Sequence, residues 1–193
     1  GWSNGADIIN CRNGATVYAS GYSGGIVGTV RAGGKSVIEG CYNVGSVVGK
    51  DTGLGGIVGH IDTTREQGGT NVEVTVRNCY NIGSVTARDG AVGGIVGHLS
   101  AGGNGTSVHV TVSACYNMGI VTADDNAGGI AGRVQAGNEI RNCYNAGKVT
   151  VTGMNILDGA GGIASLVTSG NEISGCYYDA GQTACGVSRS QSQ

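Results

Sequence analysis

The chain has 193 residues, of which 40 are glycine, and it contains no proline and no phenylalanine. Glycine at this density excludes a helical bundle, because it would cost about 1 kcal/mol per helical position relative to alanine. The formal net charge of −2, with 12% charged residues, argues against a nucleic-acid or anionic-membrane partner, and no apolar run is long enough for a transmembrane segment.

Two short phrases alternate along the chain. Cys-Tyr-Asn-x-Gly, with degenerate copies at both ends, begins at Cys11, Cys41, Cys79, Cys115, Cys143 and Cys176. Gly-Gly-Ile ends at Ile26, Ile57, Ile95, Ile130 and Ile163. Their alternation predicts five repeats, over 11–40, 41–78, 79–114, 115–142 and 143–175. Residues 1–10 then form an N-terminal partial coil, and 176–193 a partial repeat with a polar tail.

The fixed segments of each repeat predict β-strands. Residues 72–76 and 108–112 alternate apolar and polar with period two, and valine and isoleucine dominate them. The variable stretches 62–71 and 100–107 are polar and glycine-rich, as expected of loops. Repeats of this length suit one coil of three short strands joined by turns.

Stacking of such coils gives an all-β fold, a parallel β-helix or β-solenoid of about five coils. The parallel-crossover rule favours right-handed winding. Neighbouring coils at roughly 4.8 Å would make a rod on the order of 24 Å long. We expect the Gly-Gly pairs to supply positive φ at corners and close backbone approach inside the coil.

Gly-Gly-Ile-Val-Gly alternating with Cys-Tyr-Asn-x-Gly-x-Val resembles the GLUG-motif repeats of bacterial surface and secreted proteins. The resemblance covers the chain from about Ile8 to Tyr178. It implies an extracellular or cell-surface location. In some large members, such as immunoglobulin-A-cleaving metallopeptidases, these repeats are accessory, and the family's motif carries no catalytic residues to transfer.

The six repeat cysteines occupy equivalent positions, so they should form a column with parallel Cβ directions. That geometry favours buried free thiols over disulfides between neighbours, although some bridging stays open. A metal–thiolate site has little support, because no CxxC spacing is present. Cys185 lies nine residues after Cys176 and could close a C-terminal loop with it as a disulfide.

Two further columns flank the cysteines. Asn13, Asn43, Asn81, Asn117 and Asn145 predict a structural ladder of stacked amides. Tyr42, Tyr80, Tyr116, Tyr144 and Tyr177 lie one residue after the cysteines, so alternation puts the two columns on opposite faces. If cysteine faces the core, the tyrosines form an exposed stripe that could bind a sugar or a protein. If tyrosine faces the core, that idea fails.

Acidic residues and histidines offer the remaining chemistry. Asp51, Asp89 and Asp125 follow the valine column by four residues and could hold Ca²⁺, although solvated turn acids are the simpler interpretation and no other cofactor is expected. His60 and His98 lie in neighbouring coils, but without a third ligand they make a weak case for a metal site.

These observations predict a non-catalytic solenoid module of a bacterial surface or secreted protein, acting as a stalk or adhesion segment. No nucleophile elbow, phosphate loop or HExxH is present, so no enzyme is expected. One alternative is a filament subunit that stacks end to end on copies of itself, because coil ends expose strand edges. Another is a carbohydrate-binding β-helix that uses the tyrosine column. The expected partner is therefore a surface protein, a glycan or a second copy.

Overall fold

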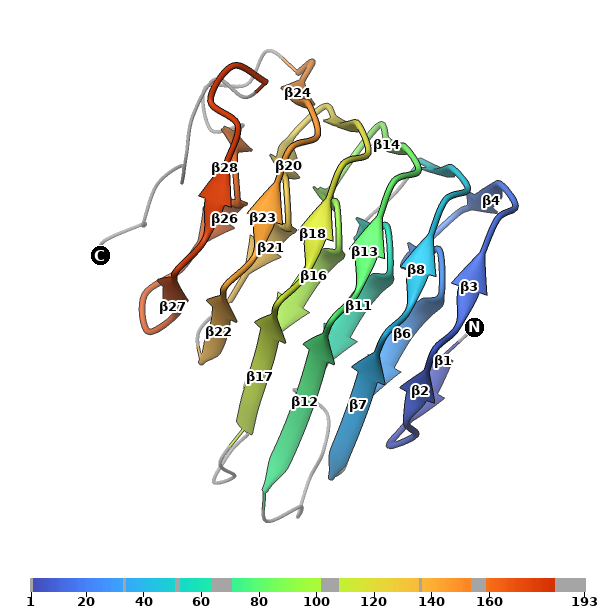
Figure 1. Cartoon of the computed structure of the whole chain (residues 1–193), viewed down its shortest axis with the longest axis vertical. Helices are drawn as coiled ribbons and strands as arrows, with labels where there is room; N and C mark the ends of the chain where they lie inside the picture. The colour runs from blue at the N-terminus through green and yellow to red at the C-terminus, as the bar shows by residue number, and fades with distance from the viewer. Residues whose placement is uncertain are drawn as a thin grey trace.

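The computed structural model describes residues 2–32, 34–50, 53–63, 71–101, 108–135, 137–153 and 159–182. The described chain is all-β, and every strand pairs in parallel with its counterpart in the next coil. Five parallel sheets result, which confirms the predicted β-helix. In Figure 1 the strands of the front layer run upward, the strands of the layer behind them run downward, and the coils advance from blue to red, so the winding is right-handed. None of the described segments is a helix long and apolar enough to cross a membrane.

Each sheet takes one strand from each successive coil. Sheet A comprises β1 (Trp2–Asn4), β6 (Val27–Arg31), β11 (Val58–Asp62), β16 (Val96–Ser100), β21 (Ala131–Val134) and β26 (Ala164–Val167). Sheet B comprises β2 (Ile8–Ile9), β7 (Lys35–Glu39), β12 (Val72–Arg77), β17 (Val108–Ser113), β22 (Asn138–Arg141) and β27 (Glu172–Ser174). Sheet C comprises β3 (Arg12–Asn13), β8 (Tyr42–Asn43), β13 (Tyr80–Asn81), β18 (Tyr116–Asn117), β23 (Tyr144–Asn145) and β28 (Tyr177–Tyr178).

The two remaining sheets are shorter and complete the coil. Sheet D comprises β4 (Val17–Ala19), β9 (Val47–Gly49), β14 (Val85–Ala87), β19 (Val121–Ala123) and β24 (Val149–Val151). Sheet E comprises β5 (Ser23–Gly24), β10 (Leu54–Gly55), β15 (Ala91–Gly93), β20 (Asn126–Gly128) and β25 (Gly159–Gly161).

A coil therefore has five strands where the repeat length suggested three. Two tight corners interrupt segments that the apolar periodicity alone predicts as continuous strands. Between sheets B and C the chain turns at one residue of positive φ, which is Asn10, Gly40, Asn78, Ala114, Asn142 or Gly175. Between sheets C and D the ladder asparagine closes a turn on its own backbone, as when Asn81 Nδ2 donates to Gly83 O at 2.8 Å.

The apolar side chains form two cores. The larger lies inside sheets A, B and C and contains the isoleucines of the Gly-Gly-Ile phrase, the inward residues of sheet B and the repeat cysteines. The smaller lies between sheets D and E and includes Val47, Leu54, Val85 and Val92. Valine and isoleucine supply most of both cores because branched side chains pack well on a pleated surface.

The asparagine ladder lies beside the Gly-Gly pairs. Asn43 Nδ2 donates to Asn81 Oδ1 at 2.8 Å, and Asn81 Nδ2 donates to Asn117 Oδ1 at 2.8 Å; both asparagines are fully buried. A Cβ added to Gly56 would overlap the side chain of Asn81 and the carbonyl oxygen of Gly94. The pairs thus serve close approach, as expected. Positive φ at these pairs was a wrong expectation, since none of them adopts it.

Ala114 is the exception at the B–C corner, because the other corner residues are asparagine or glycine. Its φ of 49° costs an L-residue with a Cβ about 1 kcal/mol. Replacing Ala114 by Gly should therefore raise the free energy of unfolding by about 0.5–1 kcal/mol in denaturant titrations. Ala123→Gly, in buried strand β19, should lower it. A destabilised Ala114→Gly variant would contradict the corner assignment.

Candidate binding face

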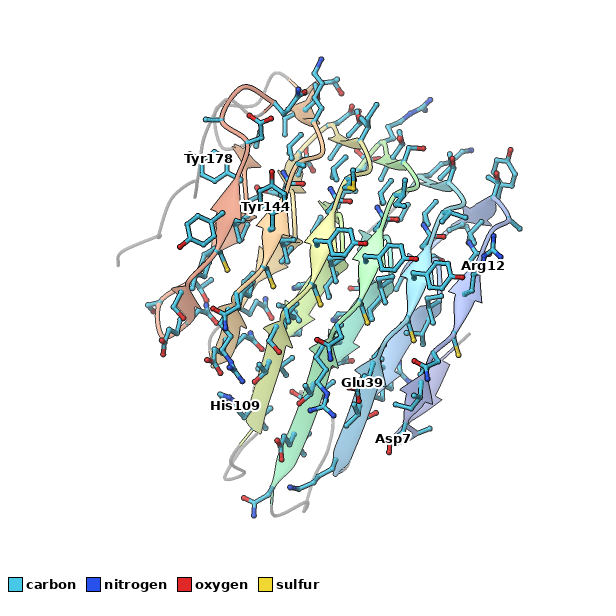
Figure 2. All side chains as sticks on the ribbon, in the orientation of Figure 1. Asp7, Arg12, Glu39, His109, Tyr144 and Tyr178 are labelled. Carbon is cyan, nitrogen blue, oxygen red and sulfur yellow. The ribbon has the colours of Figure 1, made fainter. Side chains whose placement is uncertain are left out.

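The repeat cysteines fix which face of sheet C points outward. Cys41, Cys79, Cys115 and Cys143 are buried against the larger core, and their sulfur atoms form a row of one per coil in Figure 2. Each thiol donates to the carbonyl two residues earlier, as from Cys79 Sγ to Arg77 O at 3.1 Å. The cysteine side chains point inward, so the tyrosine side chains one residue later point outward.

The cysteines are free thiols in the described chain. Cys11 is exposed, Cys176 is partly buried, and the four between them are buried. Burial raises the pKa of Cys41 to about 11. Hydrogen bonds with Cys143 and Cys79, together with burial, hold the pKa of Cys115 well above its usual value. Cys41 and Cys115 are therefore neutral thiols at physiological pH, whereas hydrogen bonds with Cys115 lower the pKa of Cys79 and of Cys143. Cys185, the predicted partner of Cys176, lies outside the described residues.

The tyrosines form a stacked outer column. The rings of Tyr42 and Tyr80 are 4.8 Å apart and 6° from parallel, and those of Tyr80 and Tyr116 are 5.0 Å apart and 5° from parallel. The Arg12 guanidinium covers the Tyr42 ring at 5.7 Å. Tyr144 and Tyr177 continue the column and are 47% and 71% exposed. Stacking occupies the faces of the central rings, so the column presents mainly ring edges and hydroxyl groups to solvent.

An aliphatic column lies beside the tyrosines, and the sequence interpretation missed it. It consists of the variable residue of Cys-Tyr-Asn-x-Gly, two positions after tyrosine and on the same face. Val44, Ile82 and Met118 are 38%, 48% and 56% exposed. The two columns together make the tyrosine–aliphatic strip, defined as Tyr42, Tyr80, Tyr116, Tyr144, Tyr177, Val44, Ile82 and Met118. A contiguous apolar strip on a polar surface is typical of an interaction site.

Charged side chains border the strip on sheet B. Arg77 donates to Glu39 at 2.7 Å and, by that hydrogen bond, lowers the pKa of Glu39. Lys35 pairs with Glu73 at 2.9 Å. Exposed pairs of this kind contribute little to folding, so their effect is to pattern the surface charge beside the strip. Glu39, His109 and Tyr144 lie on the face shown in Figure 2.

The acidic column expected at Asp51, Asp89 and Asp125 does not form as predicted. The backbone N–H of Asp124 donates to Arg88 O, so Asp124 stacks on Asp89, and Asp125 lies one position further along. A one-residue difference in turn length between the two coils causes this offset. Asp51 lies outside the described residues. Within the ranges that the structure describes, no group of three His, Cys, Asp or Glu side chains is placed to hold a metal ion.

The two histidines form a stack on the outside of sheet A. Their rings are 4.8 Å apart, and Tyr22 stacks on His60 at 4.1 Å. Ser100 Oγ lies 3.0 Å from His60 Nε2 and 3.1 Å from His98 Nε2. Burial, followed by the charges of His60 and Arg133, lowers the pKa of His98 to about 4, and Asp62 only partly opposes this. His98 is therefore neutral at pH 7.

Because the pKa of His98 is lower in the folded chain than its ordinary value of 6.5, the unfolded chain binds the proton more tightly. The stability that His98 contributes should be complete above pH 6.5 and should fall as the pH drops towards 4, by at most about 3 kcal/mol. Urea titrations from pH 7.5 to 4 should show this slope, and His98→Gln should flatten it. An unchanged slope in His98→Gln would contradict the assignment.

Comparison with known proteins gives one informative similarity. No protein-family model matches the sequence, and no curated protein matches it. The chain is similar to the crystal structure of a putative immunoglobulin A1 protease from Bacteroides ovatus, with a TM-score of 0.62 and 26% identity. The similarity covers 91% of this chain and 50% of that protein, so the chain spans about half its length.

This similarity corrects the expectation that no enzyme is involved. The similar protein is named a putative protease, so the match contradicts the exclusion of an enzyme; because it covers half of that protein, it assigns no activity to this chain. The expectation relied on short catalytic motifs, and a motif search does not detect a site assembled from side chains in different coils. The contact of Ser100 in β16 with His60 in β11, 40 positions apart in the chain, shows how neighbouring coils bring distant side chains together.

Proposed function

We propose that the chain is a β-solenoid module of a secreted or surface-exposed bacterial protein with protease-like relatives, and that it holds a protein ligand on the tyrosine–aliphatic strip. The observation that carries the proposal is the strip itself, which holds six of the ten large apolar side chains that are exposed in the described chain. Similarity to a putative immunoglobulin A1 protease supports an extracellular location and suggests an immunoglobulin as the probe. The rigid stacked coils would hold that ligand in a fixed orientation.

The geometry favours a protein ligand over a glycan. Sugars bind to the open faces of aromatic rings, whereas Tyr42, Tyr80 and Tyr116 cover each other's faces at 4.8–5.0 Å. On these three central rings, the ring edges and hydroxyl groups remain exposed beside the aliphatic side chains. Tyrosine, methionine and arginine are enriched at protein interfaces, and all three occur on or beside the strip.

The charged border of sheet B supports the same conclusion. Lys35, Glu39, Glu73 and Arg77 alternate in sign along β7 and β12, and each remains at least partly exposed. Such a pattern favours a partner with complementary charges of both signs, as folded proteins have, over a uniformly acidic polymer. The strip would supply the apolar centre of the interface, and sheet B its polar rim.

Surface plasmon resonance with immobilised immunoglobulin A1 tests the proposal. Tyr80→Ala combined with Tyr116→Ala should weaken binding at least about tenfold, because aromatic anchors at an interface centre commonly contribute 2 kcal/mol or more. Tyr18→Ala is the matched control: Tyr18 is 82% exposed but lies in β4 of sheet D, away from the strip, so binding should not change.

A second immobilised sample of immunoglobulin A1, enzymatically deglycosylated, distinguishes a protein ligand from a glycan ligand. Unchanged binding after deglycosylation supports a protein epitope. Loss of binding would contradict it and favour the carbohydrate alternative. Absence of binding to either sample, or equal binding by the double variant and the wild type, would overturn the proposed function.

A further inference from the structure

A small cavity lies beside sheet A and the turns that lead into sheet E. Its volume is about 180 Å³. Strands β16 and β21 contribute His98 and Arg133, and the sheet E side contributes Asp125 and Asn126. Tyr22 lines it as well, held in place by its stacking on His60. None of these side chains belongs to the tyrosine–aliphatic strip.

Arg133 is a cation without a counter-ion in the described chain. No ion pair involves it among the described residues, and its Nε is buried without a hydrogen-bond partner. A buried donor with no acceptor is rare in native proteins, and a bound ion or ligand is a common reason for one. His98 is neutral at pH 7, so Arg133 carries the formal positive charge among the side chains that line this cavity.

The opposite wall offers acceptors. The N–H of Asn126 donates to Gly90 O, and this pairing places Asp125 beside Gly90 at the cavity. The one-residue offset that removed Asp125 from the predicted acidic column therefore places Asp125 among the residues that line the cavity. The Ser165 hydroxyl, which donates to Gly159 O, lies 3.3 Å from Asn126 Oδ1.

We propose that this cavity binds a small carboxylic acid that carries a hydrogen-bond donor on the adjacent carbon. The ligand carboxylate would accept hydrogen bonds from the Arg133 guanidinium, including the unpartnered Nε, in the paired geometry that arginine favours. The adjacent ammonium or hydroxyl group would donate to Asp125 across the cavity, and the Tyr22 ring would bound one side.

The size of the cavity restricts the ligand. The cavity volume is about 180 Å³. That is well below the range of about 300–1,000 Å³ typical of sites for larger ligands. A free amino acid or a single sugar acid has the required chemistry and size. The two sources share a carboxylate and a neighbouring donor, and binding experiments separate them.

Isothermal titration calorimetry of the full chain at pH 7 and constant ionic strength tests the proposal with alanine, glucuronate and acetate. One of the two donor-bearing acids should bind in the millimolar range or tighter, and acetate at least about tenfold more weakly, because it cannot engage Asp125. Preference for alanine would assign an amino-acid site, and preference for glucuronate a sugar-acid site.

Variants identify the groups responsible. Arg133→Gln should weaken binding of the preferred acid at least about tenfold, and Asp125→Asn should remove its advantage over acetate. Arg141→Gln is the matched control, because Arg141 pairs with Glu139 on sheet B and should not affect the cavity. Circular dichroism verifies folding of each variant. If Arg133→Gln fails to fold, Arg133→Lys replaces it, since lysine keeps the charge without the Nε donor and should still weaken binding.

Two results would overturn the proposal. One is the absence of saturable binding of both alanine and glucuronate at millimolar concentrations. The other is binding that the folded Arg133 variant leaves unchanged. Neither result depends on the immunoglobulin experiment, because the cavity and the strip lie on different sheets and share no residue.

Discussion

The stacked asparagine amides impose the constraint on which the rest of the structure depends. Each buried amide bonds to the next coil and to its own turn, so the side chains must repeat in register through every coil. The amides lie directly beside the second glycine of the facing Gly-Gly pair, where no Cβ fits. At the last coil Tyr178 takes the ladder position, and its ring covers Gly162.

This register determines which residues are available for function. With Asn81 directed inward and Cys79 also inward two positions earlier, Tyr80 and Ile82 must point to solvent. Repetition of that arrangement in each coil turns single exposed side chains into the tyrosine–aliphatic strip. The cavity at Arg133 has a different origin, because it depends on a departure from the repeat in the turn that carries Asp125.

The sequence predicted part of the repeating coil, and it failed where the chain departs from the repeat. The parallel stacking was predictable, because columns such as Val47 and Val85 recur at fixed distances from the repeat cysteine. The five-strand coil was not, because one residue of positive φ ends a strand without altering its apolar pattern. The aliphatic column was overlooked because position x varies in identity while keeping its exposure. Asp125 was misplaced because spacing was counted from Val121 through a turn of different length.

The most direct test of the central constraint is the free energy of unfolding of Asn81→Asp at pH 7, measured by urea titration. The substitution keeps the shape of the side chain but removes the donor to Asn117 Oδ1 and Gly83 O and places a charge at a fully buried position. We predict a loss of at least about 3 kcal/mol, or failure to fold, and a smaller loss for Asn13→Asp at the partly exposed end of the ladder. An Asn81→Asp variant within about 0.5 kcal/mol of the wild type would contradict the role given to the ladder.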